Sequence, residues 1–385
     1  MTKYDRNTDN RMFWIRELER RKAVQEPSAM TRYCEEHELI SEAEIHGRVY
    51  YEEGLLSSWW TGASTYIGGL NTYALRLDLA TADDFRRTED GELILTASED
   101  GYFSRSLEDE IISLMSLWLH TRFFWVHCTT GEFSQNSISH KHGDLFTYHA
   151  CKNPAQKKSN LFKGSRKSKK NLRSLETMLE MVKRLPVNVQ RRYYLAASHY
   201  ADAIRLIGFD DDIAYIRLVS AIEVLAYLEK LKDDELPEKL RRMTEENRTG
   251  FTDPEKSELN SYLRHRKVRF KFLQFINKYS DGYFTNRPTT PEHCWVTQIS
   301  LEQYADAIYK ARSKFLHEGE PLWISHEMPR DDIEERGWDL DGSLGMVRDQ
   351  HEWPQSEKVP TVLFFEELVR HCLLNYLGIF PMNRL

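Results

Sequence analysis

The stretch LEQYADAIYKARSKFLHEG, Leu301 to Gly319, predicts an amphipathic helix. Its apolar side chains recur every three or four residues, which is the spacing of an amphipathic helix. Gly319 is a stop signal, so the helix should end near His317 or Glu318. Arg312 lies beside the apolar stripe, about 40° from it at 100° per residue. A guanidinium can hold two phosphate oxygens and an imidazole can move a proton near neutral pH, so this arginine and histidine favour phosphodiester chemistry.

The arrangement of an arginine, four residues and a histidine resembles the R-x4-6-H motif of the HEPN superfamily (higher eukaryotes and prokaryotes nucleotide-binding domain). The segment YKARSKFLHEG looks most like the Apea-like branch. An upstream segment, LVSAIEVL, resembles the LxxAxExL helix of the same branch and contains Glu223. The resemblance covers roughly residues 172 to 377. Four other pairs match the spacing but lack this context: Arg32/His37, Arg122/His127, Arg192/His199 and Arg287/His293.

The resemblance implies a metal-independent endoribonuclease with no cofactor. Arg312 would hold the scissile phosphate, and His317 would act as general base or acid on the ribose 2′-OH or the leaving 5′-oxygen. Glu223 would lie near both residues. Supporting phosphate contacts are expected from Tyr309, Ser313 and Lys314, each of which is otherwise an ordinary helix-surface residue. Many active members of the family carry Asn, Asp or His where Ser313 stands.

The expected partners follow from the same resemblance. RNA is the substrate, and phage, transfer or messenger RNA is the expected target in a prokaryotic defence or toxin role. Five residues along an ideal helix turn about 140°, so Arg312 and His317 do not point the same way. Either the last turn relaxes at Gly319, or two copies form a shared cleft, as is common in the family. We expect a homodimer, with a protein or phage-derived trigger as a further partner.

Two alternatives stay open at this point. One is a non-catalytic HEPN module that binds nucleic acid or a protein partner. The other concerns Glu223, which stands among apolar residues. An isolated buried carboxylate costs several kcal/mol, so Glu223 needs either solvent or a cation. It lies on a narrow solvent-exposed strip of its helix, or it pairs with an arginine of a neighbouring helix.

Bulk composition limits the class of protein. The chain has 385 residues and a net charge of −7, so contact with nucleic acid or an anionic membrane has to come from a local patch. Five scattered cysteines without a CxxC pair predict reduced thiols. The N-terminus lacks the apolar run of a signal peptide, and no apolar stretch approaches the roughly 18 residues of a membrane span. We therefore expect a soluble cytoplasmic protein that does not contact membranes.

The predicted fold class is α+β, with a mixed α/β-sheet domain over residues 1–151 followed by an all-α HEPN-type bundle over 174–385. The first domain contains β-prone runs, separated by glycine-containing turns, and then a helical pattern. The runs are Ile45–Tyr51, Tyr73–Leu79 and Glu92–Thr96, and the helix is Ser106–Trp125. The role of this domain is not indicated beyond sensing or positioning.

Residues 152–173 form a basic linker with nine lysines and arginines and no acid. It is either a solvated connection or a strip that binds RNA phosphates with strong salt dependence. The residues that would contact RNA are Lys157, Lys158, Lys163, Arg166, Lys167, Lys169 and Lys170.

The second domain reads as helices separated by Pro186, Gly208 and longer breaks. The predicted helices are Leu175–Leu185, Val189–Ile207, Asp211–Leu231, Arg269–Tyr279, Leu301–Glu318 and Thr361–Leu377. A polar stretch over 319–360 contains Trp323, Trp338 and Trp353. It is a functional lid, a partner-docking segment or a set of small strands.

The segment SHKHGDLFTYHAC contains several metal-ligand residue types: His140, His142, Asp144, His149 and Cys151. In an extended conformation the first three would share a face and could bind zinc. Because Gly143 favours a turn and no second ligand pair follows at standard spacing, we expect no metal site here.

Overall fold

The computed structural model describes residues 12, 14–15, 18–19, 22, 32–41, 43–52, 55–63, 71–80, 85–87, 93–95, 107–131, 138–140, 170–229, 268–287, 292–325, 338–340, 345–348, 351–354 and 357–378. The chain divides into two compact units, Met1–Gly208 and Phe209–Leu385. Each unit is described by itself below.

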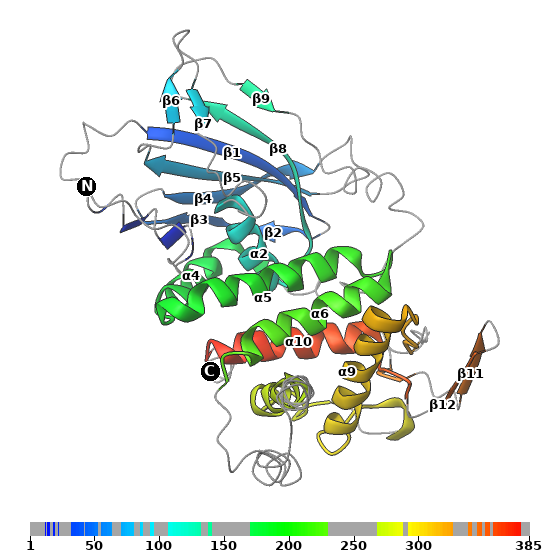
Figure 1. Cartoon of the computed structure of the whole chain (residues 1–385). Helices are drawn as coiled ribbons and strands as arrows, with labels where there is room; N and C mark the ends of the chain where they lie inside the picture. The colour runs from blue at the N-terminus through cyan, green and yellow to red at the C-terminus, as the bar shows by residue number, and fades with distance from the viewer. Residues whose placement is uncertain are drawn as a thin grey trace, which may run out of the picture. The chain divides into compact units, whose positions relative to one another are not determined.

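The first unit contains an antiparallel sheet with the strand order β3-β4-β5-β1-β8-β9 (Figure 1). Its strands are β1 (Arg32–Ser41), β3 (Arg48–Tyr51), β4 (Leu56–Ala63), β5 (Asn71–Ala80), β8 (Phe123–Gly131) and β9 (Ile138–His140). Leu39 of β1 lies opposite Tyr73 of β5 on one side and Trp125 of β8 on the other. Leu39 and Tyr73 are fully buried, so this part of the sheet is covered by apolar packing.

Short strands complete the first unit. β2 (Ile45–His46) pairs in parallel with β10 (Lys170–Asn171), and β6 (Phe85–Arg87) pairs with β7 (Leu93–Leu95). The predicted run Ile45–Tyr51 is divided into β2 and β3 because Gly47 adopts a left-handed φ of 89°, which glycine accepts readily. The predicted strand at Tyr73–Leu79 is confirmed within β5, and the one at Glu92–Thr96 is confirmed over Leu93–Leu95, which is β7.

The first unit contains the helices α2 (Leu107–Leu119), α4 (Leu175–Lys183) and α5 (Val187–Leu206), with a short 3₁₀ turn η3 (Leu172–Ser174) before α4. Residues 14–15, 18–19 and 22 are also helical. The prediction of one helix over Ser106–Trp125 is wrong after Leu119. His120 adopts a left-handed φ of 47°, and Phe123 and Trp125 belong to β8. Aromatic residues suit a strand as well as a buried helix face, so periodicity alone did not locate the end of the helix.

The boundary between the two units differs from the predicted one. Residues 174–206 were assigned to the second domain, but α5 packs against α2, and Tyr51 of β3 donates a 2.5 Å hydrogen bond to Glu180 of α4. Arg205 Nε donates to the Phe123 carbonyl at 2.9 Å. These contacts place α4 and α5 in the first unit, and the boundary falls at Gly208.

The second unit is mainly helical. It contains α6 (Asp211–Ala226), a helix over residues 268–279, η5 (Glu292–Cys294), α9 (Leu301–Glu318) and α10 (Val362–Tyr376). α6 is capped by Asp210, which accepts from the Ile213 N–H at 3.0 Å. Tyr215 of α6 stacks on Phe365 of α10 with 4.7 Å between the ring centroids. The predicted helices are confirmed in place, except that the one predicted over Asp211–Leu231 ends at Ala226.

The stretch over 319–360 is not one loop. β11 (Gly345–Arg348) and β12 (His351–Pro354) form an antiparallel hairpin, and Ile324 forms a parallel bridge with Val359. Trp323 is buried. The α+β class is therefore confirmed for the chain, while the all-α expectation for its second half is wrong at these strands. In the part of the chain described here, no helix has the length and apolarity that crossing a bilayer requires.

Candidate functional site

The predicted catalytic helix, α9, brings Arg312 to Glu223 of α6. Arg312 Nη2 lies 3.0 Å from Glu223 Oε2, in an ion pair whose side chains are 21% and 17% exposed. Of the two interpretations of Glu223, the pair with an arginine of a neighbouring helix is the one that the structure contains. Two segments about 90 residues apart in the sequence therefore meet through the two residues that carry the family resemblance.

Tyr309 completes a polar cluster inside the second unit. Burial raises the pKa of Glu223, while the Arg312 charge and a hydrogen bond with Tyr309 oppose that rise. Burial and the neighbouring Glu223 carboxylate raise the pKa of Tyr309 to about 12, so its hydroxyl is neutral and can donate at physiological pH. The Arg312 guanidinium lies 5.9 Å from the Tyr309 ring, which also contacts the Phe272 ring. Arg312 is thus oriented by a carboxylate and an aromatic side chain.

The guanidinium of Arg312 keeps donor capacity beyond the Glu223 pair. Its Nε is buried and has no hydrogen-bond partner among the described residues. A guanidinium carries five N–H groups in a fixed fork, so one carboxylate oxygen at Nη2 does not exhaust it. The side chain is 21% exposed, so an oxyanion at its exposed part would meet a cation that is already oriented.

His317 is exposed in the last turn of α9. As predicted, the helix ends at Glu318 and Gly319 caps it with a left-handed φ of 72°. The last turn is helical through Glu318, and the Gly319 N–H bonds the Phe315 carbonyl. The alternative of a relaxed last turn is therefore not what the structure contains. Arg312 and His317 leave the helix about 140° apart, on different faces of one copy.

The other predicted supporting residues have different surroundings. Lys314 points away from Arg312, and its amine lies 3.1 Å from a Glu357 oxygen and 3.6 Å from a Glu320 oxygen. The hydrogen bond to Glu357 raises the pKa of Lys314. Ser313 is partly exposed on α9. The structure therefore groups Tyr309 with Arg312 and places Lys314 in a separate pocket.

Two of the competing arginine–histidine matches have a buried arginine. Arg122 is almost fully buried and donates to the Ile207 carbonyl at 3.4 Å. Arg287 is 5% exposed and pairs with Asp339. Neither guanidinium is placed to receive a phosphate from solvent, whereas Arg312 is partly exposed.

Most of the predicted RNA-binding strip lies outside the described residues: Lys157, Lys158, Lys163, Arg166, Lys167 and Lys169. Lys170 is described. It stands in β10, and its amine donates to the His120 carbonyl at 2.5 Å. One of its three N–H groups therefore binds the protein itself.

The histidine-rich segment also lies mostly outside the described residues. His140 ends β9, while His142, Asp144, His149 and Cys151 are not described. Within the described ranges, no group of three or more His, Cys, Asp or Glu residues is placed to hold a metal ion. Cys294 and Cys372 are buried free thiols.

A pocket beside α9 was not predicted from the sequence. It is lined by Ala307, Ala311 and Lys314 of α9, and by Glu320, Trp323 and Glu357. The lysine and alanine positions follow helical spacing and could have indicated a shared face. Glu357 comes from a segment about 40 residues away, and no sequence signal connects it with Lys314.

Searches against protein-family models, curated proteins and solved structures found no match for this chain.

Proposed function

We propose that the protein is a metal-independent HEPN-type endoribonuclease in which Arg312 of one copy and His317 of a second copy act on the same phosphate. The observation that carries this proposal is the arrangement on α9, where an oriented, partly exposed guanidinium and an exposed imidazole stand one and a half turns apart. Since they occupy different faces, a two-fold related copy is the simplest way to bring them together.

The proposed reaction needs no metal ion. His317 accepts the proton of the ribose 2′-OH, the resulting oxygen attacks the adjacent phosphorus, and the 5′-oxygen leaves with a proton taken from the protonated imidazole or from water. Because nucleophile and phosphorus belong to one nucleotide, the attack benefits from a high effective concentration. Arg312 stabilises the charge that develops on the phosphate oxygens. The products are a 2′,3′-cyclic phosphate and a 5′-hydroxyl end.

Glu223 would act through Arg312 in this proposal. Its carboxylate holds the guanidinium at 3.0 Å, and Tyr309 holds the carboxylate. Glu223 and Tyr309 are therefore positioning residues, and substitution of either should weaken cleavage less than substitution of Arg312.

A non-catalytic module that binds nucleic acid or a protein is the second candidate. The observation that favours it is that Arg312 already has a carboxylate partner and faces away from His317 within one copy. An arginine in a purely structural interhelical bridge has the same surroundings. This candidate predicts RNA binding or protein binding without strand scission.

An RNA-cleavage assay in EDTA separates the two candidates. We expect the wild type to cut RNA with chelator present, and Arg312→Ala and His317→Ala each to cut about 100-fold more slowly or worse. Glu302→Gln is the matched control, because Glu302 is an exposed residue of the first turn of α9, distant from both side chains. RNA binding without cleavage by the wild type would support the module instead.

Mixing the two inactive variants tests the shared site. If each site takes its arginine and its histidine from different copies, a mixed dimer of Arg312→Ala and His317→Ala contains one complete site. Random exchange would then restore roughly a quarter of wild-type activity. No recovery after exchange, with dimers verified by sedimentation, would contradict the two-copy arrangement.

A further inference from the structure

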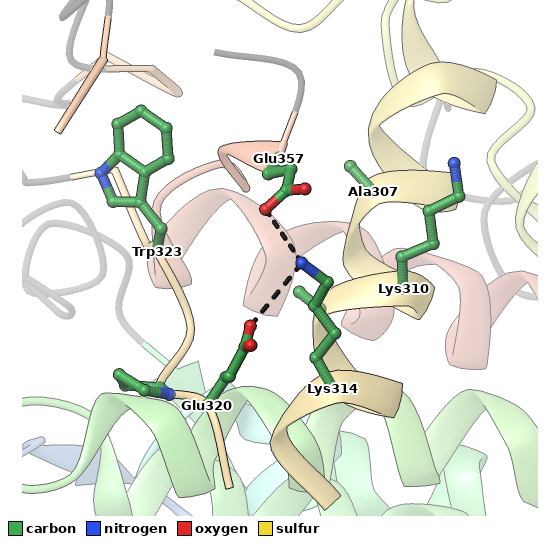
Figure 2. Close-up of a pocket in the computed structure, with 8 residues that line it drawn as sticks. Ala307, Lys310, Lys314, Glu320, Trp323 and Glu357 are labelled. Atoms are coloured by element: carbon green, nitrogen blue, oxygen red, sulfur yellow. Dashed lines mark hydrogen bonds and ion pairs between the residues drawn. The ribbon is translucent and has the colours of Figure 1, made fainter. Parts of the chain in front are cut away.

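The pocket beside α9 has a volume of about 180 Å³, which is small beside the sites of drug-sized ligands. Figure 2 shows Lys314 reaching from α9 toward Glu357 and Glu320, with Trp323 on the opposite side of the space. Ala307 and Ala311 leave room beside α9 because their side chains are single methyl groups. The space therefore fits one flat ring system rather than an extended ligand.

The polar groups of the pocket are two lysines and two carboxylates. Lys314 lies 3.1 Å from Glu357 and 3.6 Å from Glu320, so its charge is already balanced. Lys310, the other lysine at this pocket, pairs with Asp306 at 3.0 Å. A phosphate placed here would meet two carboxylates at close range, which disfavours an anion. An uncharged ligand with both donors and acceptors matches the lining better.

One acceptor in the pocket has unused capacity. Glu320 Oε2 is buried from solvent, and the Lys314 amine approaches it only to 3.6 Å, so this contact is an ion pair with at most a weak hydrogen bond. A buried carboxylate oxygen with one long contact is incompletely hydrogen-bonded. A ligand N–H group that reached this oxygen would donate the hydrogen bond that it lacks.

We propose that this pocket binds a guanine base. The guanine O6 atom accepts from the Lys314 amine, and the N1–H and exocyclic N2–H₂ groups donate to the Glu320 carboxylate. The flat ring lies against the alanine methyl groups and Trp323. Adenine lacks the O6 acceptor, and uracil has no exocyclic amine, so both make fewer of these bonds.

The position of the pocket gives the guanine a role in RNA recognition, and this part rests on the proposed function. Lys314 and His317 are three residues apart on α9 and so share a face of the helix. A guanine bound beside Lys314 would therefore lie on the His317 side of α9. The pocket would thus select a guanine next to the cut phosphate.

Calorimetric titration of the full chain with guanosine, adenosine, cytidine and uridine tests the pocket without any cleavage step. We expect saturable binding of guanosine, and binding of the other three at least tenfold weaker. Glu320→Gln should weaken guanosine binding tenfold or more, since the amide replaces one of two acceptor oxygens with a donor. Lys314→Met should do the same, and Glu302→Gln should bind as the wild type does.

Three outcomes would overturn the proposal: no guanosine binding by folded wild type, equal binding of all four nucleosides, or unchanged binding by both pocket variants. Thermal unfolding of each variant verifies that it is folded.

The dinucleotide GpU and GTP distinguish RNA from a free nucleotide as the source of the base. GpU binding as tight as GTP supports RNA, and GTP binding over tenfold tighter contradicts it. A protein that binds guanosine but cuts no RNA would retain the pocket and refute only the nuclease.

Discussion

Two arginine–carboxylate pairs in the second unit have the same chemistry and different surroundings. Arg287 Nη2 and Asp339 Oδ1 are 2.5 Å apart, with side chains 5% and 1% exposed. Arg312 and Glu223 are 3.0 Å apart and 21% and 17% exposed. Both arginines begin a stretch that matches the same arginine–histidine spacing. The spacing therefore does not distinguish a buried arginine from a partly exposed one, and the two differ only in their tertiary surroundings.

The contacts of Arg287 explain its structural role. Its guanidinium lies over the Tyr283 ring at 4.6 Å and over the Phe364 ring at 5.0 Å, and Nη1 donates to the Tyr283 hydroxyl. Asp339 also accepts from the Val296 N–H at 3.0 Å, so the pair joins three separate segments. Both Arg287 and Arg312 leave Nε without a hydrogen bond among the described residues, so that feature does not separate them.

The largest effect is expected from Asp339→Ala. It leaves the buried Arg287 charge without its main partner, and we expect the free energy of unfolding to fall by about 3–5 kcal/mol in urea denaturation. The double variant Arg287→Met/Asp339→Leu is the control, because it removes both charges and should recover most of the loss. A single variant as stable as the wild type would show that the pair is dispensable.

Arg312→Ala should have a smaller effect on the same measurement. The pair is partly exposed, and Glu223 can take up a proton when the cation is removed, so we expect a loss of about 1–2 kcal/mol. A loss as large as that of Asp339→Ala would contradict the comparison. It would mean that Arg312 is a structural arginine like Arg287.

The smallest effect is a pH dependence carried by Glu223. Burial raises the pKa of its carboxyl above the ordinary value of 4.5, so the folded protein holds this proton more tightly than the unfolded chain does. The stabilising contribution is thus complete below pH 4.5 and is lost as pH rises through the folded-state pKa. Unfolding curves at several pH values should show the wild type losing stability relative to Glu223→Gln as pH rises. A stability difference that does not change with pH would show that burial and the Arg312 charge have equal and opposite effects on the pKa of Glu223.

Much of the helical part of the fold could be predicted from the sequence. The apolar spacing of α9 and its stop at Gly319 are local properties, and helix bonds join residues four apart. Strands were predicted less well. β1, which pairs with both β5 and β8, and β4 were missed. Strand pairing depends on partners that are distant in the sequence, and local patterns do not contain it.

The residues of the candidate site were likewise predicted only in part. Arg312, His317 and Glu223 were singled out from motifs, and the structure joins the first and the third. The pocket of Lys314, Glu320, Trp323 and Glu357 was not foreseen, because its members come from α9, the segment after it and the approach to α10.

The sequence by itself determined where most of the helices begin, which helix carries the arginine and histidine, and that a carboxylate stands among apolar residues on another helix. These are consequences of spacing along one segment. Only the tertiary structure decided which carboxylate each arginine meets, how exposed each pair is, and that Lys314 faces a pocket rather than Arg312. Such properties depend on segments far apart in the chain being brought together, because burial and charge partners are defined by neighbours in space.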